Sequence, residues 1–392
     1  MADDAVIVGA GPAGSALALR LARAGLGVRM IERKRFPRAK ACGEYLSPGA
    51  VQELAKLDLA GKALRTSVPI RGVRLYGPRG DPLELPFVDA HAVAVERRLL
   101  DASLLEAARD AGAVVEHAHA SDVIFEEGRA IGVRTCDPSG ASAERRARWV
   151  LGADGLGSVV AQRLGLVDPI DAKRERFALG GHVPISAGDW LSMFSAEDAY
   201  YAVNPLGDGR ANVMLVVPRR ELAAWGGRID EEAPRRIARI VAGRASVEAF
   251  PELGQRLAIG PLRRRVRAVH APGALLVGDA AGFLSPFTGQ GIWLALESAR
   301  DAAAALLDVA RGARSEPEAW LEYARKRRAS WIPRRMLSAF VELLQRHDAL
   351  ALRALDRARR RRRAAERILA ACAGVLPART ALDPLLLGTL LA

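Results

Sequence analysis

Short apolar runs that end in glycine alternate along this chain with longer segments whose apolar residues recur at helical spacing. In the first such unit, an apolar run over residues 5–8 precedes an alanine- and leucine-rich segment over 13–24 and a second apolar run over 27–31. This order predicts a β-α-β unit. Because its strands would be parallel, we expect an α/β fold built on an open sheet with helices on both faces.

Later segments extend the same pattern. Residues 93–111 place leucine and alanine at helical spacing, and residues 114–133 contain two strand-like pieces around a Glu-Glu-Gly-Arg turn, which predicts a hairpin. We expect buried strands at 149–151 and 274–277 and a helix at 292–310.

Between residues 168 and 265 the pattern changes, because short strand candidates at 200–203 and 211–217 are interrupted by proline and glycine. This pattern predicts an antiparallel sheet with a helix over 233–242 packed against it. We expect residues 68–87 to join that sheet.

The chain is therefore expected to form two interleaved domains and a tail. The expected segments are 1–67, 96–167 and 266–310 for a nucleotide-binding domain, 68–95 and 168–265 for a second domain, and 311–392 for a helical C-terminal region.

The chain carries 58 Lys and Arg residues against 45 Asp and Glu, a formal net charge of +13. This balance is compatible with a nucleic acid, an anionic membrane or an anionic substrate as partner, and equally with a basic surface that has no specific partner. The three cysteines are widely separated and the six histidines are scattered. We therefore expect no metal site and no structural disulfide, as is usual in a reducing cytoplasm.

The acidic N-terminus runs straight into a predicted strand, which does not resemble a secretory signal. No apolar run approaches the ~20 residues needed to span a bilayer. We expect a cytoplasmic protein that is soluble or peripheral at a membrane.

The first motif with chemical meaning is the glycine-rich turn after the first strand. Gly9, Gly11 and Gly14 allow a tight turn, close approach of the main chain to a pyrophosphate, and close helix packing. The helix N-terminus that follows offers N–H groups to the phosphates. Glu32 ends the next strand, where a carboxylate accepts ribose hydroxyls. These residues predict a dinucleotide site.

Two further glycine-rich turns lie far along the chain. One contains Asp154 and Gly155, and the other follows a predicted strand and contains Gly278 and Asp279. A strand-end aspartate can accept a hydrogen bond from a ribityl hydroxyl, and the next helix N-terminus can aim N–H groups at the N1/O2 edge of a flavin. The cofactor is then long and held at both ends, as FAD would be. We expect Glu32 and Asp279 to lie close enough for one FAD molecule to bridge them.

The order and spacing of these motifs resemble the flavoprotein superfamily that contains para-hydroxybenzoate hydroxylase and geranylgeranyl reductase, over residues 6–310. The resemblance implies a Rossmann-like FAD-binding domain of the glutathione reductase type, interleaved with an antiparallel-sheet substrate domain and followed by a helical tail. It implies non-covalent FAD. Only one dinucleotide fingerprint is present, so NADPH or NADH is expected to visit transiently, or another donor to reduce the flavin.

The resemblance also assigns residues to the cofactor, with Arg98 as an alternative to its neighbour Arg97. The expected FAD contacts are Gly9, Gly11, Pro12, Ala13, Gly14, Glu32, Arg33, Arg97, Asp154, Gly155, Gly278, Asp279, Pro286, Gly289, Gln290, Gly291 and Ile292.

Within the superfamily, the chain is more similar to the geranylgeranyl reductase-like branch. Residues 36–48 around Cys42 resemble the cysteine-glycine loop of that branch, and residues 200–213 resemble its substrate-sheet signature. Gly282 stands where aromatic hydroxylases typically have histidine, Ala161 stands where they often have arginine, and the W-x-W-x-I-P signature of flavin halogenases is absent. Cys42 is a candidate catalytic group, the alternative being a small buried residue in a loop that holds the cofactor.

Aromatic residues on the second predicted sheet indicate a lipophilic substrate and an apolar pocket beside the flavin. They are Phe177, Trp190, Phe194, Tyr200 and Tyr201, and Tyr201 is a candidate proton donor. We favour hydride reduction of a carbon–carbon double bond in an isoprenoid or polyketide-like molecule. The first alternative is hydroxylation of an aromatic or polyketide ring with NAD(P)H and O₂. The second is a non-catalytic electron-transfer or redox-sensing flavoprotein, which predicts no cavity beside the flavin.

The C-terminal region combines an arginine run over 357–363 with apolar segments over 368–376 and 385–391. One interpretation is a basic amphipathic surface that contacts an anionic membrane. The other is a solvated charged helix followed by helices packed on the catalytic body. We expect no nucleic-acid partner, because aromatic residues that would stack on bases are not interleaved with the charge. The oligomeric state stays open.

Overall fold

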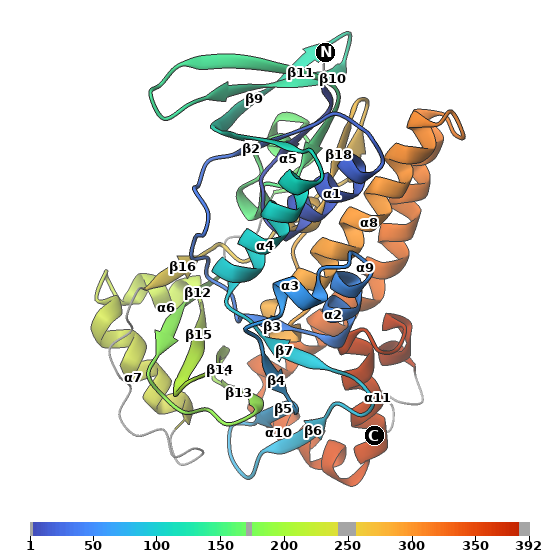
Figure 1. Cartoon of the computed structure of the whole chain (residues 1–392). Helices are drawn as coiled ribbons and strands as arrows, with labels where there is room; N and C mark the ends of the chain where they lie inside the picture. The colour runs from blue at the N-terminus through green and yellow to red at the C-terminus, as the bar shows by residue number, and fades with distance from the viewer. Residues whose placement is uncertain (1–2, 170–174, 242–255, 384–392) are drawn as a thin grey trace.

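A computed structural model describes residues 3–169, 175–241 and 256–383 (Figure 1). The expected apolar segment 385–391 and the last residue of the helix expected at 233–242 lie outside the described residues.

A sheet with a parallel centre forms the first layer of the fold. Within the described residues its path runs β17-β18-β11-β1-β2-β8, and β10 and β9 continue from β11 as an antiparallel ribbon. These strands are β1 Asp3–Val8, β2 Val28–Glu32, β8 Val114–His117, β9 His119–Glu126, β10 Arg129–Cys136, β11 Ser142–Gly152, β17 His270–Ala271 and β18 Ala274–Leu276. Since β18, β11, β1 and β2 are parallel, their carboxyl ends share one edge of the sheet, where ligands bind in such folds.

Helices pack on this sheet and on a second sheet, and they make up most of the C-terminal part of the described chain (Figure 1). They are α1 Pro12–Arg23, α2 Pro48–Ala55, α3 Ala60–Ala63, α4 Arg97–Asp110, α5 Val159–Arg163, α6 Arg219–Ala224, α7 Ile229–Val241, α8 Gly291–Ala310, α9 Glu316–Arg346, α10 Asp348–Arg360 and α11 Arg362–Ala373. The expected β-α-β unit is confirmed as β1-α1-β2. The helix expected at 93–111 begins later, at Arg97, because Val93 lies in a strand, the conformation that β-branched residues favour.

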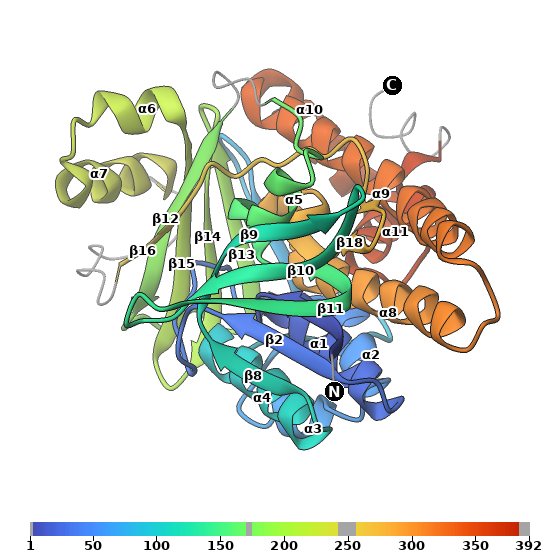
Figure 2. The same cartoon turned by 90° about the horizontal axis from the view of Figure 1, so that it is seen from above.

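The two faces of the first sheet are covered differently. Ala5 and Ile7 of β1 pack against α1, α4 and α8, whereas Val6 and Val8 point into a cluster with β9, β10 and α5. This split follows from the alternation of side chains along a strand. Helices lie on both faces, as expected, and the β9–β10 ribbon joins α5 in covering the second face (Figure 2).

The expected hairpin joins β9 to β10. Glu127 and Gly128 form its turn, with φ of 49° and 78° respectively. Two positive φ values are what a two-residue type I′ turn requires, and this turn matches the twist of the flanking strands.

The second sheet has the order β16-β12-β15-β14-β13-β5-β6 within the described residues. Its strands are β5 Gly72–Tyr76, β6 Leu83–Pro86, β12 Arg176–Val183, β13 Trp190–Ala196, β14 Ala199–Gly207, β15 Arg210–Pro218 and β16 Leu257–Ile259. It is antiparallel except that β13 and β5 are parallel, so the expectation of an antiparallel sheet is correct for all pairs but one. α7 packs on one face of this sheet.

Part of the segment expected to join the second sheet lies elsewhere. β5 and β6 join it, but β4 (Val68–Ile70) pairs with β7 (Ala92–Ala94), which also pairs with β3 (Tyr45–Leu46). This small sheet lies between the two large ones and carries the end of the segment that contains Cys42 (Figure 1).

The C-terminal helices pack on the body of the protein. α9 runs along α8, and α10 and α11 lie against β6 (Figure 1). The carboxylate of Glu316, at the start of α9, accepts hydrogen bonds from Arg129 at 2.7 Å, from Trp149 Nε1 at 3.1 Å and from the main-chain N–H of Gly273 at 2.9 Å. No helix among the described residues has the length and apolar character that crossing a membrane demands.

Candidate active site

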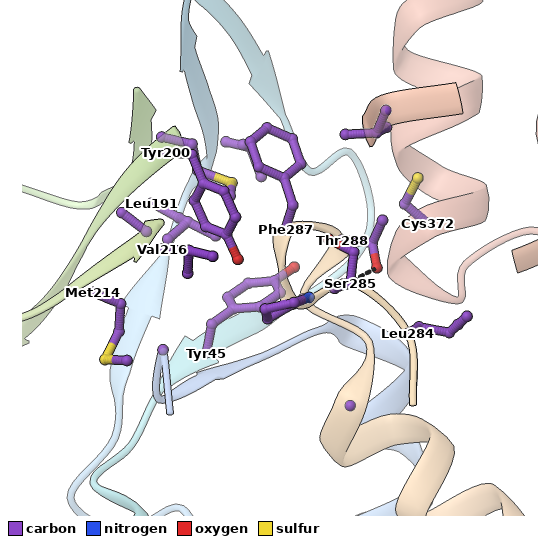
Figure 3. Close-up of a pocket in the computed structure, with 18 of the residues that line it drawn as sticks. Tyr45, Leu191, Tyr200, Met214, Val216, Leu284, Ser285, Phe287, Thr288 and Cys372 are labelled. Carbon is purple, nitrogen blue, oxygen red and sulfur yellow. Dashed lines mark hydrogen bonds between the residues drawn. The ribbon is translucent and has the colours of Figure 1, made fainter. Parts of the chain in front are cut away.

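A cavity of about 420 Å³ extends from the glycine-rich turn before α1 to the inner faces of α9, α10 and α11. Its walls also include the segment around Cys42 and one face of the second sheet. Figure 3 shows the part where Tyr45, Tyr200 and Phe287 face one another, with Cys372 of α11 on the far side. The edge that carries the nucleotide motifs and the apolar chamber are thus parts of one continuous space.

Two positions of the glycine-rich turn, Gly9 and Gly14, have no room for a side chain. A Cβ on Gly9, whose φ is 97°, would lie 2.6 Å from the carbonyl oxygen of Ala153. A Cβ on Gly14 would overlap the carbonyl of Gly9, whereas a Cβ on Gly11 would meet only Arg38, at 3.9 Å. α1 starts at Pro12 and Ala13 with no side-chain cap, so its first N–H groups are available to an anion.

Glu32 lies at the carboxyl end of β2 beside this turn. Its carboxylate accepts the main-chain N–H groups of Ala10 and Lys34, each at 2.8 Å, which fixes it against the glycine-rich turn. Asp279 follows β18 on the same edge of the sheet, three strand spacings away, or about 14 Å. The two carboxylates therefore follow strands that end on one edge of the sheet, and their bridging by one FAD molecule stays a prediction.

Asp279 lies in a short 3₁₀ turn, Gly278–Ala281, that faces the cavity. Burial raises the pKa of its carboxyl, while the positive charges of Lys40, Arg97, Arg327 and Arg264 act in the opposite direction. Burial, together with Arg97, lowers the pKa of Lys40. This part of the cavity therefore gathers charged side chains of both signs, and Lys40 is a cavity residue that the motifs did not reveal.

The loop from Pro286 to Ile292 forms the next section of the wall. Gly289 has a φ of 64°, and a Cβ there would lie 2.8 Å from the ring of Tyr45. Gly291 opens α8 without a side-chain cap, and no atom lies within 4 Å of the position its Cβ would take. Gln290 is 1% exposed and is not among the residues that line the cavity, and its side-chain amide has no hydrogen-bond partner among the described residues.

The two adjacent arginines occupy different places. Arg97 is buried at the first turn of α4, lines the cavity, and forms two 2.9 Å hydrogen bonds to Asp101. Although burial disfavours its charge, Asp101 and the sulfur of Cys42 hold the pKa of Arg97 above its ordinary value. Arg98 is half exposed and pairs with Glu96. Arg97 is thus the one of the pair that faces the cavity.

The second motif contributes less to the cavity than the other two. Asp154 accepts the N–H of Val159 at 2.7 Å, and burial raises its pKa, so this carboxyl mainly organises the turn that begins α5. Gly155 lines the cavity. Arg33 is exposed immediately after β2.

The segment Cys42–Glu44 is held at the cavity wall by the second sheet. Asn212 donates to the carbonyl of Cys42 and Asn204 to that of Gly43, both at 3.0 Å. The Glu44 carboxylate accepts the main-chain N–H of Arg97 at 2.8 Å. Glu44 itself has a φ of 54°, unusual for a residue with a side chain. These hydrogen bonds hold the backbone beside Cys42 in place.

The placement expected for Tyr201 is wrong. Its side chain is fully buried with Phe194 and α7, on the face of β14 that points away from the cavity. The neighbouring Tyr200 lines the cavity and packs edge-on against Phe287, with a centroid distance of 5.1 Å. Neither Phe177 nor Trp190 lines the cavity. Side chains alternate along a strand, so adjacent residues cannot serve the same face.

The C-terminal helices supply part of the wall that the sequence did not predict. Small and apolar side chains from all three face the cavity, and they include Leu337, Leu344, Ala354, Leu355, Leu369 and Cys372. Burial raises the pKa of the Cys372 thiol to about 12, so this group is an apolar wall residue. Two interpretations of the tail were open. The structure agrees with the second, because α9, α10 and α11 pack on the catalytic body.

Comparison with known proteins decides the family. The model of the FAD binding domain family matches residues 3–334. The chain belongs to this family. It is an FAD-dependent oxidoreductase, and its fold and its resemblance to the geranylgeranyl reductase-like branch are as expected from its motifs.

The relatives named below are similar to this oxidoreductase over most of its length. Digeranylgeranylglycerophospholipid reductase 2 of Methanopyrus kandleri is 32% identical over 76% of each chain. Menaquinone reductase of Mycolicibacterium smegmatis is 32% identical over 76% of this chain and 75% of its own. A geranylgeranyl bacteriochlorophyll reductase-like protein of Thermoplasma acidophilum has a solved structure with a TM-score of 0.75, 26% identity and 91% of each chain covered.

Proposed function

We propose that this protein reduces a carbon–carbon double bond in a lipophilic isoprenoid or polyketide-like substrate. The observation that carries the proposal is the continuity of the cavity, which joins the nucleotide-binding edge of the first sheet to an apolar chamber of the second. The relatives named as reductases of digeranylgeranylglycerophospholipid and of menaquinone support it, since both names denote compounds with isoprenoid chains.

The residues at the sheet edge fit non-covalent FAD. The uncapped start of α1, at Gly11–Ala13, would hold the pyrophosphate, and Glu32 the ribose of the adenosine. Asp279 would hold the ribityl chain, and the open space at Gly291 would take the ring. When bound and reduced, FAD supplies a hydride to one carbon of the double bond.

The chain's own part in the reaction is to bind the substrate, exclude water and deliver a proton. Leu191, Met193, Met214 and Val216 give the sheet side of the chamber an apolar surface that matches a hydrocarbon chain. Cys42 stands at the junction of the chamber and the nucleotide edge and is our candidate proton donor. Tyr200 takes the role that the sequence suggested for Tyr201, because Tyr200 is the tyrosine of the pair that faces the cavity (Figure 3).

The electron donor and the membrane contact are finer parts of the same proposal. NADPH or NADH would bind transiently, because the sequence has one dinucleotide fingerprint. The exposed arginines of α10 and α11, on helices whose inner faces line the chamber, favour a peripheral contact with an anionic membrane that stores the substrate.

Ring hydroxylation is the alternative that uses the same cofactor and the same cavity. The two reactions differ in their need for oxygen. We would incubate the purified protein with NADPH or NADH and with menaquinone in detergent micelles, under air and under argon. Oxidation of the nicotinamide that continues under argon, together with loss of a double bond from the menaquinone side chain in the mass spectrum, supports the reductase. Oxidation that stops under argon and consumes oxygen under air contradicts it.

The hypothesis of a non-catalytic flavoprotein predicts no cavity beside the flavin. The apolar chamber that adjoins the nucleotide edge speaks against that alternative.

A further inference from the structure

A row of polar side chains crosses the cavity face of the second sheet. His182 on β12 is paired in register with Asn212 on β15, and Asn212 with Asn204 on β14. Asn204 and Asn212 are 1% and 2% exposed. Met214 and Tyr200, on the same face of these strands, line the apolar chamber. Burying polar side chains in such a wall costs free energy unless each of them has a hydrogen-bond partner. The partners of this row are therefore of interest.

Glu44 is the partner of two members of this row, His182 and Asn212, whereas Asn204 donates to the carbonyl of Gly43. His182 Nε2 lies 2.7 Å from Glu44 Oε2, and Asn212 donates to the same oxygen at 2.9 Å. The Glu44 side chain is 6% exposed, whereas that of His182 is 32% exposed. Glu44 also lines the cavity, two residues from Cys42, and its main-chain N–H donates to the Cys42 sulfur at 3.4 Å. A hydrogen-bonded pair therefore connects solvent with the cavity wall.

The charges around His182 suit a group that gains and loses a proton. Its hydrogen bond with Glu44 outweighs partial burial and raises the pKa of His182 above 6.5, Glu96 acts in the same direction, and Arg210 opposes it. Arg210 pairs with Glu96 at 3.1 Å, so the positive charge of Arg210 beside His182 is partly neutralised. Histidine with a raised pKa can exchange protons with water near neutral pH.

Reduction of a double bond consumes a proton, so the cavity needs a supply of protons. A hydride, which carries two electrons, forms a bond to one carbon, and a proton forms a bond to the other as the π bond breaks. Each turnover therefore removes one proton from the cavity, and a proton from solvent must replace it.

We propose that His182 and Glu44 are the path by which this proton enters the cavity from solvent, a role that rests on the reductase function proposed above. His182 takes a proton from water and passes it from Nε2 to Glu44 Oε2. Glu44 then gives the proton to the sulfur of Cys42, which has given its own proton to the substrate carbon, and Glu44 returns to the carboxylate. Asn212 keeps the carboxylate in place by donating to Oε2.

The test compares wild type with His182→Gln, which keeps a hydrogen-bond donor and loses the titration, and with His182→Ala. Each protein is reduced without oxygen, mixed with menaquinone in detergent micelles, and the reoxidation of its FAD is followed from about pH 5.5 to about pH 9, in H₂O and in D₂O. The exposed His91→Gln is the control, because His91 lies outside the cavity wall.

We expect wild-type reoxidation to slow as the pH rises through the raised pKa of His182. His182→Gln should be slower by about tenfold or more at low pH and should lose that pH dependence. Added imidazole should restore the reoxidation rate of His182→Ala, because the space left by the histidine ring is open to solvent. His91→Gln should behave as wild type.

Three results would overturn the proposal. They are a His182→Gln enzyme with the wild-type rate and pH profile, a slow His182→Ala enzyme that imidazole does not restore, and a pH profile equally altered in His91→Gln. A wild-type enzyme that does not reduce menaquinone under these conditions overturns the proton path together with the reductase proposal. An active wild type with an unaltered variant overturns the proton path alone.

Discussion

Gly278 and Ala13 lie so close that a Cβ on Gly278 would stand 2.9 Å from the Cβ of Ala13. The two residues belong to the third and the first glycine-rich motifs, so this contact joins the turns that we assign to opposite halves of FAD. Gly278 has a φ of 60°, and its N–H donates to Ser298 Oγ at 2.9 Å. The contact fixes the spacing between the two turns.

Gly278→Ala should therefore separate the motifs. The added methyl group meets Ala13 and the left-handed backbone disfavours a side chain, so we expect a loss of about 1–3 kcal/mol in stability and a lower FAD content. Denaturant unfolding and the flavin absorbance per protein measure the two effects. A variant with wild-type stability and full flavin content would contradict the packing described here.

Gly291→Ala should act in the opposite way. The methyl group meets no protein atom within 4 Å and stands in a helix, so stability should be unchanged or raised by up to about 1 kcal/mol. The flavin ring is proposed to occupy that space, so FAD affinity should fall by about tenfold or more, or about 1.4 kcal/mol. Gly61→Ala in α3, which also meets nothing within 4 Å, is the matched control and should bind FAD normally. Normal FAD binding by Gly291→Ala would place the ring elsewhere.

Tyr200→Phe and Tyr201→Phe form a matched pair. The hydroxyl of Tyr200 is buried at the cavity without a partner among the described residues, so it is available to an acceptor on a ligand such as a quinone carbonyl. We expect Tyr200→Phe to raise the KM for menaquinone about tenfold. Tyr201→Phe should leave the KM unchanged, because its ring packs on the α7 side. Steady-state kinetics of the two variants give the KM values. Equal KM values would refute the placement of Tyr200 on the cavity face of β14 and of Tyr201 on the opposite face.

The neighbouring tyrosines also show what the sequence leaves undetermined. β14 is buried on both faces, so its residues do not alternate between apolar and polar, and the pattern cannot tell which face meets the cavity. Gly9, Gly14, Glu32 and Asp279 could be predicted because each acts within a short motif whose geometry is local. The motifs also implied the sheet edge on which they meet.

Contacts between distant segments could not be predicted in this way. His182 and Glu44 are 138 residues apart, and nothing in either neighbourhood indicates the pairing. Ala354 and Leu355 of α10 line the cavity, but they look like ordinary residues of a helix rich in alanine and arginine. The role of the C-terminal helices as a wall of the chamber emerges only from packing.

Ala354→Phe tests that wall. Ala354 is half-buried and faces the chamber, so a phenyl group should occupy space needed by a long substrate. We expect a higher KM for menaquinone, by about tenfold, with FAD binding unchanged. Ala364→Phe in α11, at a half-buried position away from the cavity wall, is the control. A KM equal to that of the control would show that the substrate does not reach α10.

Glu316→Gln tests how α9 is attached. The substitution weakens the hydrogen bonds from Arg129, Trp149 and Gly273, and we expect a loss of about 2 kcal/mol. Burial opposes the charge of Glu316, but Arg129 and the other donors hold its pKa below 4.5. The carboxylate therefore contributes stability above pH 4.5, and this contribution is lost as the pH falls through the lowered pKa.

Urea unfolding at neutral pH and near pH 3 provides the measurement. The difference between wild type and Glu316→Gln should shrink in acid. A constant difference, or none at neutral pH, would contradict the role given to this carboxylate.

Product analysis after a single anaerobic turnover tests the central claim most directly. The protein is reduced without oxygen, mixed with a stoichiometric amount of menaquinone or of digeranylgeranylglycerophospholipid, and the extracted lipid is examined by mass spectrometry. The account predicts reoxidised FAD and a lipid that has gained two hydrogen atoms at a carbon–carbon double bond. An unchanged lipid from both probes, with a product that carries a new oxygen atom once air is admitted, would contradict it.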